Sequence, residues 1–191
     1  NPFIYSDDNK RYHTLNYYNK SSFNSKVFKA VIDAGFTCPN KDGTKGTGGC
    51  IYCMGGSGYF TEKSDGEIYD SVKRQLAAEK ERIYKKHPDS LITAYFQANT
   101  NTYAPVATLK EAYTAALDFG VHGISIGTRA DCLPDDVIAL LCDINSKTHL
   151  TVELGLQTIH DKSAQIINRC YTYDEFLEGY RKLQESGIRT C

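Results

Sequence analysis

Short apolar runs alternate with segments of helical periodicity along most of this 191-residue chain. The apolar runs, which predict strands, lie at residues 27–34, 91–97, 123–128 and 150–157, and a fifth begins at residue 188. The segments with helical spacing lie at residues 67–87, 109–119, 134–145 and 173–185. Apolar strands separated by helices are typical of parallel βα units, so we predict an α/β protein. The pattern does not distinguish an open sheet from a barrel, but in both the loops that follow the strands build the active site.

Charge and hydropathy exclude several classes of protein. The chain has 22 Lys and Arg against 23 Asp and Glu, so its formal net charge is -1 and no strong positive field for nucleic acid is expected. The apolar run at 27–34 contains Lys29 and Asp33 and is too short to span a bilayer. The first residues lack the pattern of a secretory signal. We therefore expect a soluble, cytoplasmic protein with no membrane partner.

The first 26 residues differ from the rest of the chain. They are polar and rich in tyrosine, and they show no clear period, whereas the strand and helix patterns begin at residue 27. We interpret residues 1–26 as an N-terminal extension packed on a core domain that is formed by residues 27–191.

Three of the seven cysteines, Cys38, Cys50 and Cys53, fall within one glycine-rich stretch at residues 36–59. Their spacing is C-x11-C-x2-C. The two-residue gap lets neighbouring thiolates bind one metal centre, and the long glycine-rich arm lets Cys38 approach from another direction. Soft thiolate ligands select zinc or an iron–sulfur centre. Three protein ligands leave one coordination position open, which is typical of a metal site that does chemistry.

Two other interpretations of these cysteines are weaker. A structural zinc site needs a fourth ligand, and only a residue distant in the sequence, such as Cys132 or His13, could supply it. A chance cluster of buried cysteines conflicts with the polar, glycine-rich character of the loop. The remaining cysteines are scattered and are expected to be ordinary small buried residues.

The cysteine motif resembles the cluster loop of the YhcC/YtqA-type radical S-adenosylmethionine (SAM) proteins, which are relatives of the Elongator catalytic subunit. The similarity covers nearly the whole chain, in five separate segments that occur in the expected order. These segments are residues 11–18, 33–53, 95–103, 126–133 and 152–158. Ala130 stands where the family pattern has Pro.

The resemblance implies a radical SAM core, that is, parallel βα repeats forming a partial TIM barrel. It implies that the three cysteines hold three irons of a [4Fe-4S] cluster and that SAM chelates the fourth iron. One electron, from a donor such as flavodoxin or ferredoxin, would then cleave SAM and generate a 5′-deoxyadenosyl radical. The cofactor carries this chemistry, while the protein positions it and excludes water.

The resemblance also implies roles for residues outside the cysteines. Tyr52 matches an aromatic residue found beside the adenine of SAM; it could also be a loop aromatic that covers the cluster, and the two roles are compatible. Glu153 and Gln157 are predicted to lie on one strand with their side chains on the same face, where they would contact SAM or the substrate and act in catalysis. Thr100 and Asn101 follow the second predicted strand, where the superfamily binds the SAM amino group, but the usual Gly-Gly is absent.

Two arginines complete the predicted site. Arg129 follows the third predicted strand and is a candidate catalytic residue, with a surface ion pair to Asp131 as the alternative interpretation. Arg169 is similar to a residue that could reach the SAM carboxylate, with a solvated arginine at a helix end as the alternative.

The substrate is not identified by the sequence. Kinship with the Elongator subunit suggests modification of a tRNA wobble uridine, with local RNA contacts from the tyrosine-rich first residues. An iron–sulfur electron carrier or sensor and a zinc-stabilised binding module remain alternatives. The family pattern continues beyond Cys191, so we expect this piece to fold as an incomplete barrel and to be inactive alone.

Overall fold

The computed structural model describes residues 3–4, 6, 9–53 and 64–191. Five parallel strands form one sheet in the order β1-β2-β3-β4-β5. The strands are β1 (Val27–Ile32), β2 (Leu91–Phe96), β3 (Gly123–Thr128), β4 (His149–Leu154) and β5 (Arg189–Thr190). The helices are α1 (Leu15–Phe23), α2 (Ile68–Tyr84), α3 (Val106–Phe119), α4 (Asp135–Asn145), α5 (Asp161–Ile166) and α6 (Tyr173–Glu185). The predicted α/β fold with a parallel sheet is confirmed.

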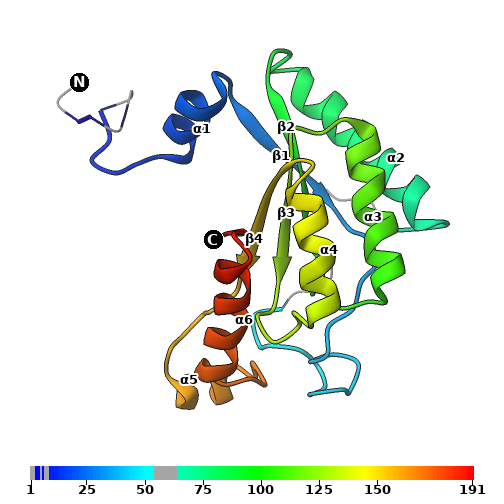
Figure 1. Ribbon diagram of the computed structural model, residues 1–191, viewed down its shortest axis with the longest axis vertical. Helices are drawn as coiled ribbons and strands as arrows, with labels where there is room; N and C mark the ends of the chain where they lie inside the picture. The colour runs from blue at the N-terminus through cyan, green and yellow to red at the C-terminus, as the bar shows by residue number, and fades with distance from the viewer. Residues whose placement is uncertain (1–2, 5, 7–8, 54–63) are drawn as a thin grey trace.

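One face of the sheet carries the hydrophobic core. Figure 1 shows α2, α3 and α4 together on that side, which we call the outer face. Residues of the first four strands point into it, among them Ile32, Phe96, Ile126 and Val152, all with 0 % of their surface exposed. Burying side chains of this size contributes about 1.5–3 kcal/mol each, so the outer face accounts for much of the stability of the fold.

The opposite, inner face is polar and curved. Lys29 of β1 forms an ion pair with Glu153 of β4, although β2 and β3 lie between them. In a flat sheet those strands would lie about 14 Å apart. The strand register also places Lys29 in the row of His149, four residues before Glu153. The contact therefore requires a sheet that curls and staggers, as the wall of a barrel does.

Two helices were not predicted from periodicity. In α1 the Thr14 side chain accepts a hydrogen bond from the Tyr17 N–H, and Asn24 ends the helix with φ 51°. This helix is held by aromatic contacts, since the ring of Phe23 lies 4.4 Å from that of His122, just before β3. It therefore packs at the N-terminal ends of the strands. The other helix, α5, has only six residues, too few to show a period.

The end of β4 differs from the prediction. The strand was predicted to reach Gln157 but ends at Leu154, and Gln157 has φ 62°, in the left-handed region. Leu156 continues the apolar character beyond the strand, which explains the error. Glu153 and Gln157 therefore do not share a strand face. In the part of the chain that the structure describes, no helix has both the length and the apolar content needed to cross a membrane.

Candidate metal centre

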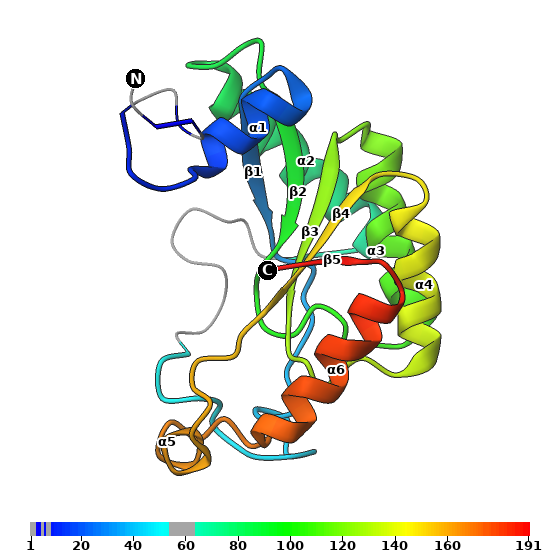
Figure 2. The ribbon, with the colours of Figure 1, turned by 60° about the vertical axis from the view of Figure 1, so that its left-hand side comes forward.

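The cysteine loop follows β1 at the C-terminal edge of the sheet. In Figure 2 the described part of this loop, in cyan, lies beside α5, beyond the ends of the strands. Backbone hydrogen bonds close the loop on itself: the Gly49 N–H donates to Asn40 O at 2.8 Å and the Lys45 N–H donates to Pro39 O at 2.8 Å. These bonds bring the arm that carries Cys38 next to the arm that carries Cys50. Residues 54–59 of the predicted loop lie outside the described residues.

The second and third cysteines lie on a tight turn. The Cys53 N–H donates to Cys50 O at 2.9 Å, so the two cysteines lie at the two ends of one turn. Cys38 and Cys50 are buried and Cys53 is exposed. Tyr52, with 47 % of its surface exposed, lies beside Cys50 and Cys53, and burial together with a hydrogen bond to Cys50 raises its pKa.

A segment after α5, residues 167–171, lies against the cysteine loop, and we call it the strap. The Ile51 N–H donates to Ile167 O at 3.1 Å, and Asn168 Nδ2 donates to Gly49 O at 2.8 Å. In return, Asn40 Nδ2 donates to Asn168 O. The cysteine loop is thus held by a segment more than a hundred residues away in the sequence.

Arg169 anchors the strap. It is 1 % exposed, and its guanidinium donates to Leu156 O and Thr158 O at 2.7 Å each and to Tyr171 O through both Nε and Nη2. The alternative of a solvated arginine is therefore wrong. Because these donors face backbone carbonyls, a contact with the SAM carboxylate stays a prediction that requires some of these bonds to be exchanged.

Arg129 and Asp131 form a buried pair, not a surface pair. Arg129 Nε and Nη2 donate to the two carboxylate oxygens of Asp131 at 2.9 Å each, and the side chains are 10 % and 3 % exposed. Lys45 of the cysteine loop adds a second ion pair to Asp131 at 2.7 Å. Burial disfavours these charges, but Arg129 and Lys45 together lower the pKa of Asp131, and Asp131 raises the pKa of Arg129. A third Arg129 bond, to Arg169 O at 2.9 Å, joins this pair to the strap.

On the inner face Glu153 lies among residues that were not predicted as site residues. It pairs with Lys29 and accepts a hydrogen bond from Ser125 Oγ at 3.0 Å. Lys29 Nζ lies 4.0 Å from the ring centroid of Tyr95, and burial, with the nearby Glu153 charge, raises the pKa of Tyr95 to about 12. In the sequence, this group was indicated by Lys29, a charged residue inside the apolar run that predicts the first strand.

Thr100 and Asn101 are buried at the ends of β2 and β3. They are 1 % and 0 % exposed, and Asn101 Nδ2 donates to Phe96 O at 3.1 Å and Gly127 O at 2.9 Å. These bonds fix the spacing of the two strand ends. Asn101 Oδ1 has no hydrogen-bond partner within the described residues. Its contact with a SAM amino group stays a prediction.

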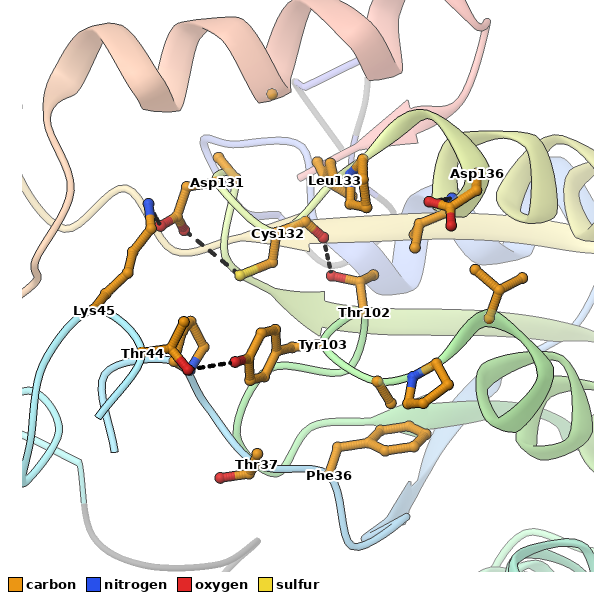
Figure 3. A pocket seen from close by; sticks show the side chains of 18 of the residues that line it. Phe36, Thr37, Thr44, Lys45, Thr102, Tyr103, Asp131, Cys132, Leu133 and Asp136 are labelled. Carbon is orange, nitrogen blue, oxygen red and sulfur yellow. Dashed lines mark hydrogen bonds and ion pairs between the residues drawn. The ribbon is translucent and has the colours of Figure 1, made fainter. Parts of the chain in front are cut away.

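A cavity of about 870 Å³ adjoins the cysteine loop (Figure 3). Thr44 and Lys45 of the loop form one wall, and the starts of α3 and α4 together with α6 form the others. The figure shows Thr44 hydrogen-bonded to Tyr103 and Thr102 hydrogen-bonded to Cys132 O. None of the residues predicted to contact SAM lines this cavity, so it is separate from the predicted cofactor site.

The residues of the loop fit an iron–sulfur group by their donor chemistry. Three thiols on one closed loop are soft ligands, and a buried amide nitrogen, that of Asn40, lies 3.5 Å from Cys50 Sγ. As placed among the described residues, however, no three His, Cys, Asp or Glu side chains are close enough to hold one metal ion.

Comparison with known proteins gives long, continuous similarities. The uncharacterized protein YtqA of Bacillus subtilis is 49 % identical over 100 % of this chain and 59 % of its own length. Protein YhcC of Escherichia coli K12 is 35 % identical over 88 % of the chain and 53 % of its own length. The uncharacterized protein MJ0486 of Methanocaldococcus jannaschii is 33 % identical over 91 % of the chain and 53 % of its own length. The chain thus spans little more than half the length of these relatives.

A match to a protein-family model assigns the chain to a family. The model of the Radical SAM superfamily matches residues 41–191, which include Cys50 and Cys53 and all strands after β1. Together with the parallel sheet, its curved inner face and the cysteine loop at the C-terminal edge, this match shows that the chain belongs to the Radical SAM superfamily.

Proposed function

We propose that the protein containing this chain reductively cleaves SAM at a [4Fe-4S] cluster held by Cys38, Cys50 and Cys53. The observation that carries this proposal is the closed cysteine loop at the C-terminal edge of a parallel sheet, the edge where such folds place their active sites. Superfamily membership supports SAM cleavage by an iron–sulfur cluster. When bound, the cluster would supply the electron that converts SAM into methionine and a 5′-deoxyadenosyl radical.

The chain's own residues would bind and orient the cofactors. The three thiolates would ligate iron, and Tyr52 would cover the SAM adenine. Glu153 lies on the inner face of the partial barrel, where a polar group of SAM or substrate could replace Lys29 as its partner. Gln157, beyond the end of β4, would approach from a different direction than Glu153.

The buried arginines would act around the cluster. Arg129 pairs with Asp131, and Asp131 also pairs with Lys45 of the cysteine loop. We therefore propose that Arg129 acts on the cluster loop, while Arg169 holds the strap and contributes to the SAM site only if its carbonyl partners are exchanged.

The decisive experiment is anaerobic reconstitution of the full-length protein followed by iron and sulfide analysis and an assay for 5′-deoxyadenosine with SAM and dithionite. We expect about four irons and four sulfides per chain and formation of 5′-deoxyadenosine. Zinc in place of iron would favour the alternative of a zinc-stabilised binding module. A stable cluster without SAM cleavage would favour the electron carrier or sensor.

We further propose a tRNA uridine as substrate, a flavodoxin or ferredoxin as electron donor, and a cytoplasmic location. The tRNA proposal rests on the similarity to the Elongator subunit. The tyrosine-rich segment around α1 packs at the N-terminal strand ends, about 20 Å from the cysteine loop for a six-residue strand. RNA contacts there would thus hold the phosphate backbone and not the reacting base. Binding of the full-length protein to tRNA, compared with a mixture of unrelated RNA, tests this proposal.

A further inference from the structure

Asn40 lies inside the cysteine loop, two residues after Cys38, and is 0 % exposed. Its amide nitrogen Nδ2 faces two acceptors: the backbone oxygen of Asn168 in the strap and Cys50 Sγ, at 3.5 Å. A sulfur atom is a weak acceptor as a thiol but a stronger one as a thiolate, because charge-assisted hydrogen bonds are about twice as strong as neutral ones. The contact therefore gains strength when Cys50 carries charge.

The neighbours of Asn40 fix the orientation of its amide. A backbone carbonyl oxygen only accepts hydrogen bonds, so the group that faces Asn168 O is the amide nitrogen and not the amide oxygen. The nitrogen carries two hydrogens, and the second is available to Cys50 Sγ. The opposite assignment would place one acceptor against another. The N–H to sulfur contact thus follows from the position of the strap.

Packing alone does not explain an asparagine at this position. Its Oδ1 atom is buried without a hydrogen-bond partner among the described residues, which costs about 1–3 kcal/mol. The loop also needs Gly46 to accommodate it, because a Cβ atom there would lie 2.2 Å from Asn40 Oδ1. An apolar residue of the same shape would avoid the unpaired oxygen. The hydrogen bonds that the amide nitrogen donates therefore explain why position 40 is an asparagine.

We propose that Asn40 is a positioning residue that raises the reduction potential of the cluster through its hydrogen bond to Cys50. This inference rests on the proposed function, because Cys50 must ligate the cluster. Adding an electron makes the cluster and its sulfurs more negative, so a donor to a ligand sulfur stabilises the reduced state more than the oxidised state. A cluster that is easier to reduce accepts an electron from a weaker donor.

The test is a redox titration of the reconstituted full-length protein, followed by electron paramagnetic resonance. We expect Asn40→Leu, which keeps the shape but removes the donor, to lower the equilibrium constant for reduction about tenfold, that is, by about 59 mV for one electron. Asn40→Ser, whose hydroxyl is too short to reach Cys50, should shift it in the same direction. If the leucine variant does not assemble a cluster, the reduction potential of the serine variant tests the proposal instead.

Asn168→Gly is the matched control. It removes the side chain that donates hydrogen bonds to Gly49 O and Thr47 O. Glycine adopts the left-handed backbone conformation of this position, φ 55°, without strain. None of the three proposed ligand sulfurs loses a hydrogen-bond donor. We expect its potential to equal that of the unmodified protein. An equal shift in this control would overturn the proposal, since looser packing of the loop would then explain the effect.

The outcomes separate this inference from the proposed function. Unchanged potentials in Asn40 variants with full iron content would overturn the role of Asn40 and leave the cluster assignment intact. An unmodified full-length protein that assembles no iron–sulfur cluster would refute the proposed function and, with it, this inference.

Discussion

The two faces of the sheet have different roles, although the same strands form both. The outer face is apolar and covered by α2, α3 and α4, and its side chains are almost fully buried. The inner face presents Lys29, Tyr95, Ser125 and Glu153, linked by an ion pair, a hydrogen bond and a cation–π contact. The outer face therefore determines stability, whereas the inner face is free to hold charges that a cofactor or substrate can use.

The largest expected effect on stability is on the outer face. Ile126→Ala removes a fully buried side chain of β3, and we expect it to lower the free energy of unfolding by about 2–5 kcal/mol, measured by denaturant titration. Iron per folded molecule after reconstitution should not change. A decrease in the free energy of unfolding below about 1 kcal/mol would contradict this comparison of the two faces, because the outer face would then not form the hydrophobic core.

The cysteine loop should respond to overpacking. A Cβ atom at Gly46 would lie 2.2 Å from Asn40 Oδ1 and 2.8 Å from Cys170 Sγ, so Gly46→Ala should cost about 1–3 kcal/mol and reduce the iron bound. The exposed neighbour Thr47, changed to Ala, is the control and should retain iron. Full iron content in Gly46→Ala would show that the loop is not closed as described.

On the inner face, stability and activity should separate. Glu153→Gln breaks a pair whose lysine is 39 % exposed, so we expect at most about 1 kcal/mol of lost stability. In the full-length protein the same change should leave the cluster spectrum intact and reduce 5′-deoxyadenosine formation at least about tenfold. Lys29→Met is the control for loss of the pair alone. Global unfolding of Glu153→Gln would instead assign this carboxylate to the core.

The smallest effect is the titration of Tyr95. Its pKa is raised from 10.0 to about 12, by burial and by Glu153, so the fold favours the neutral phenol. The resulting stabilisation is fully present below pH 10 and is lost as the pH rises from 10 to 12. The difference in ultraviolet absorbance between the unmodified protein and Tyr95→Phe should show this phenol titrating near pH 12. The same difference, measured with Glu153→Gln present in both proteins, should show it titrating nearer to pH 10. Titration near pH 10 in both backgrounds would contradict the environment described here.

The strands and most helices were predictable because burial on the outer face imposes apolar runs and helical spacing on the sequence. The cysteine loop was predictable because its three cysteines are close together in the sequence. What could not be predicted depends on contacts between distant residues. Lys29 reaches Glu153 only because the sheet curls, and the burial of Arg129 with Asp131 depends on the strap and the loop packing around them. Gln157 was misplaced because apolar character does not reveal where β4 ends.

The measurement that tests the central claim most directly is the electron paramagnetic resonance spectrum of the reduced cluster in the full-length protein, recorded with and without SAM. If Cys38, Cys50 and Cys53 leave one iron without a protein ligand, SAM should bind that iron and change the spectrum. The control Cys142→Ala, on α4, should behave like the unmodified protein, while Cys50→Ala should give no signal. A spectrum that SAM leaves unchanged would contradict the open iron position and, with it, the proposed site.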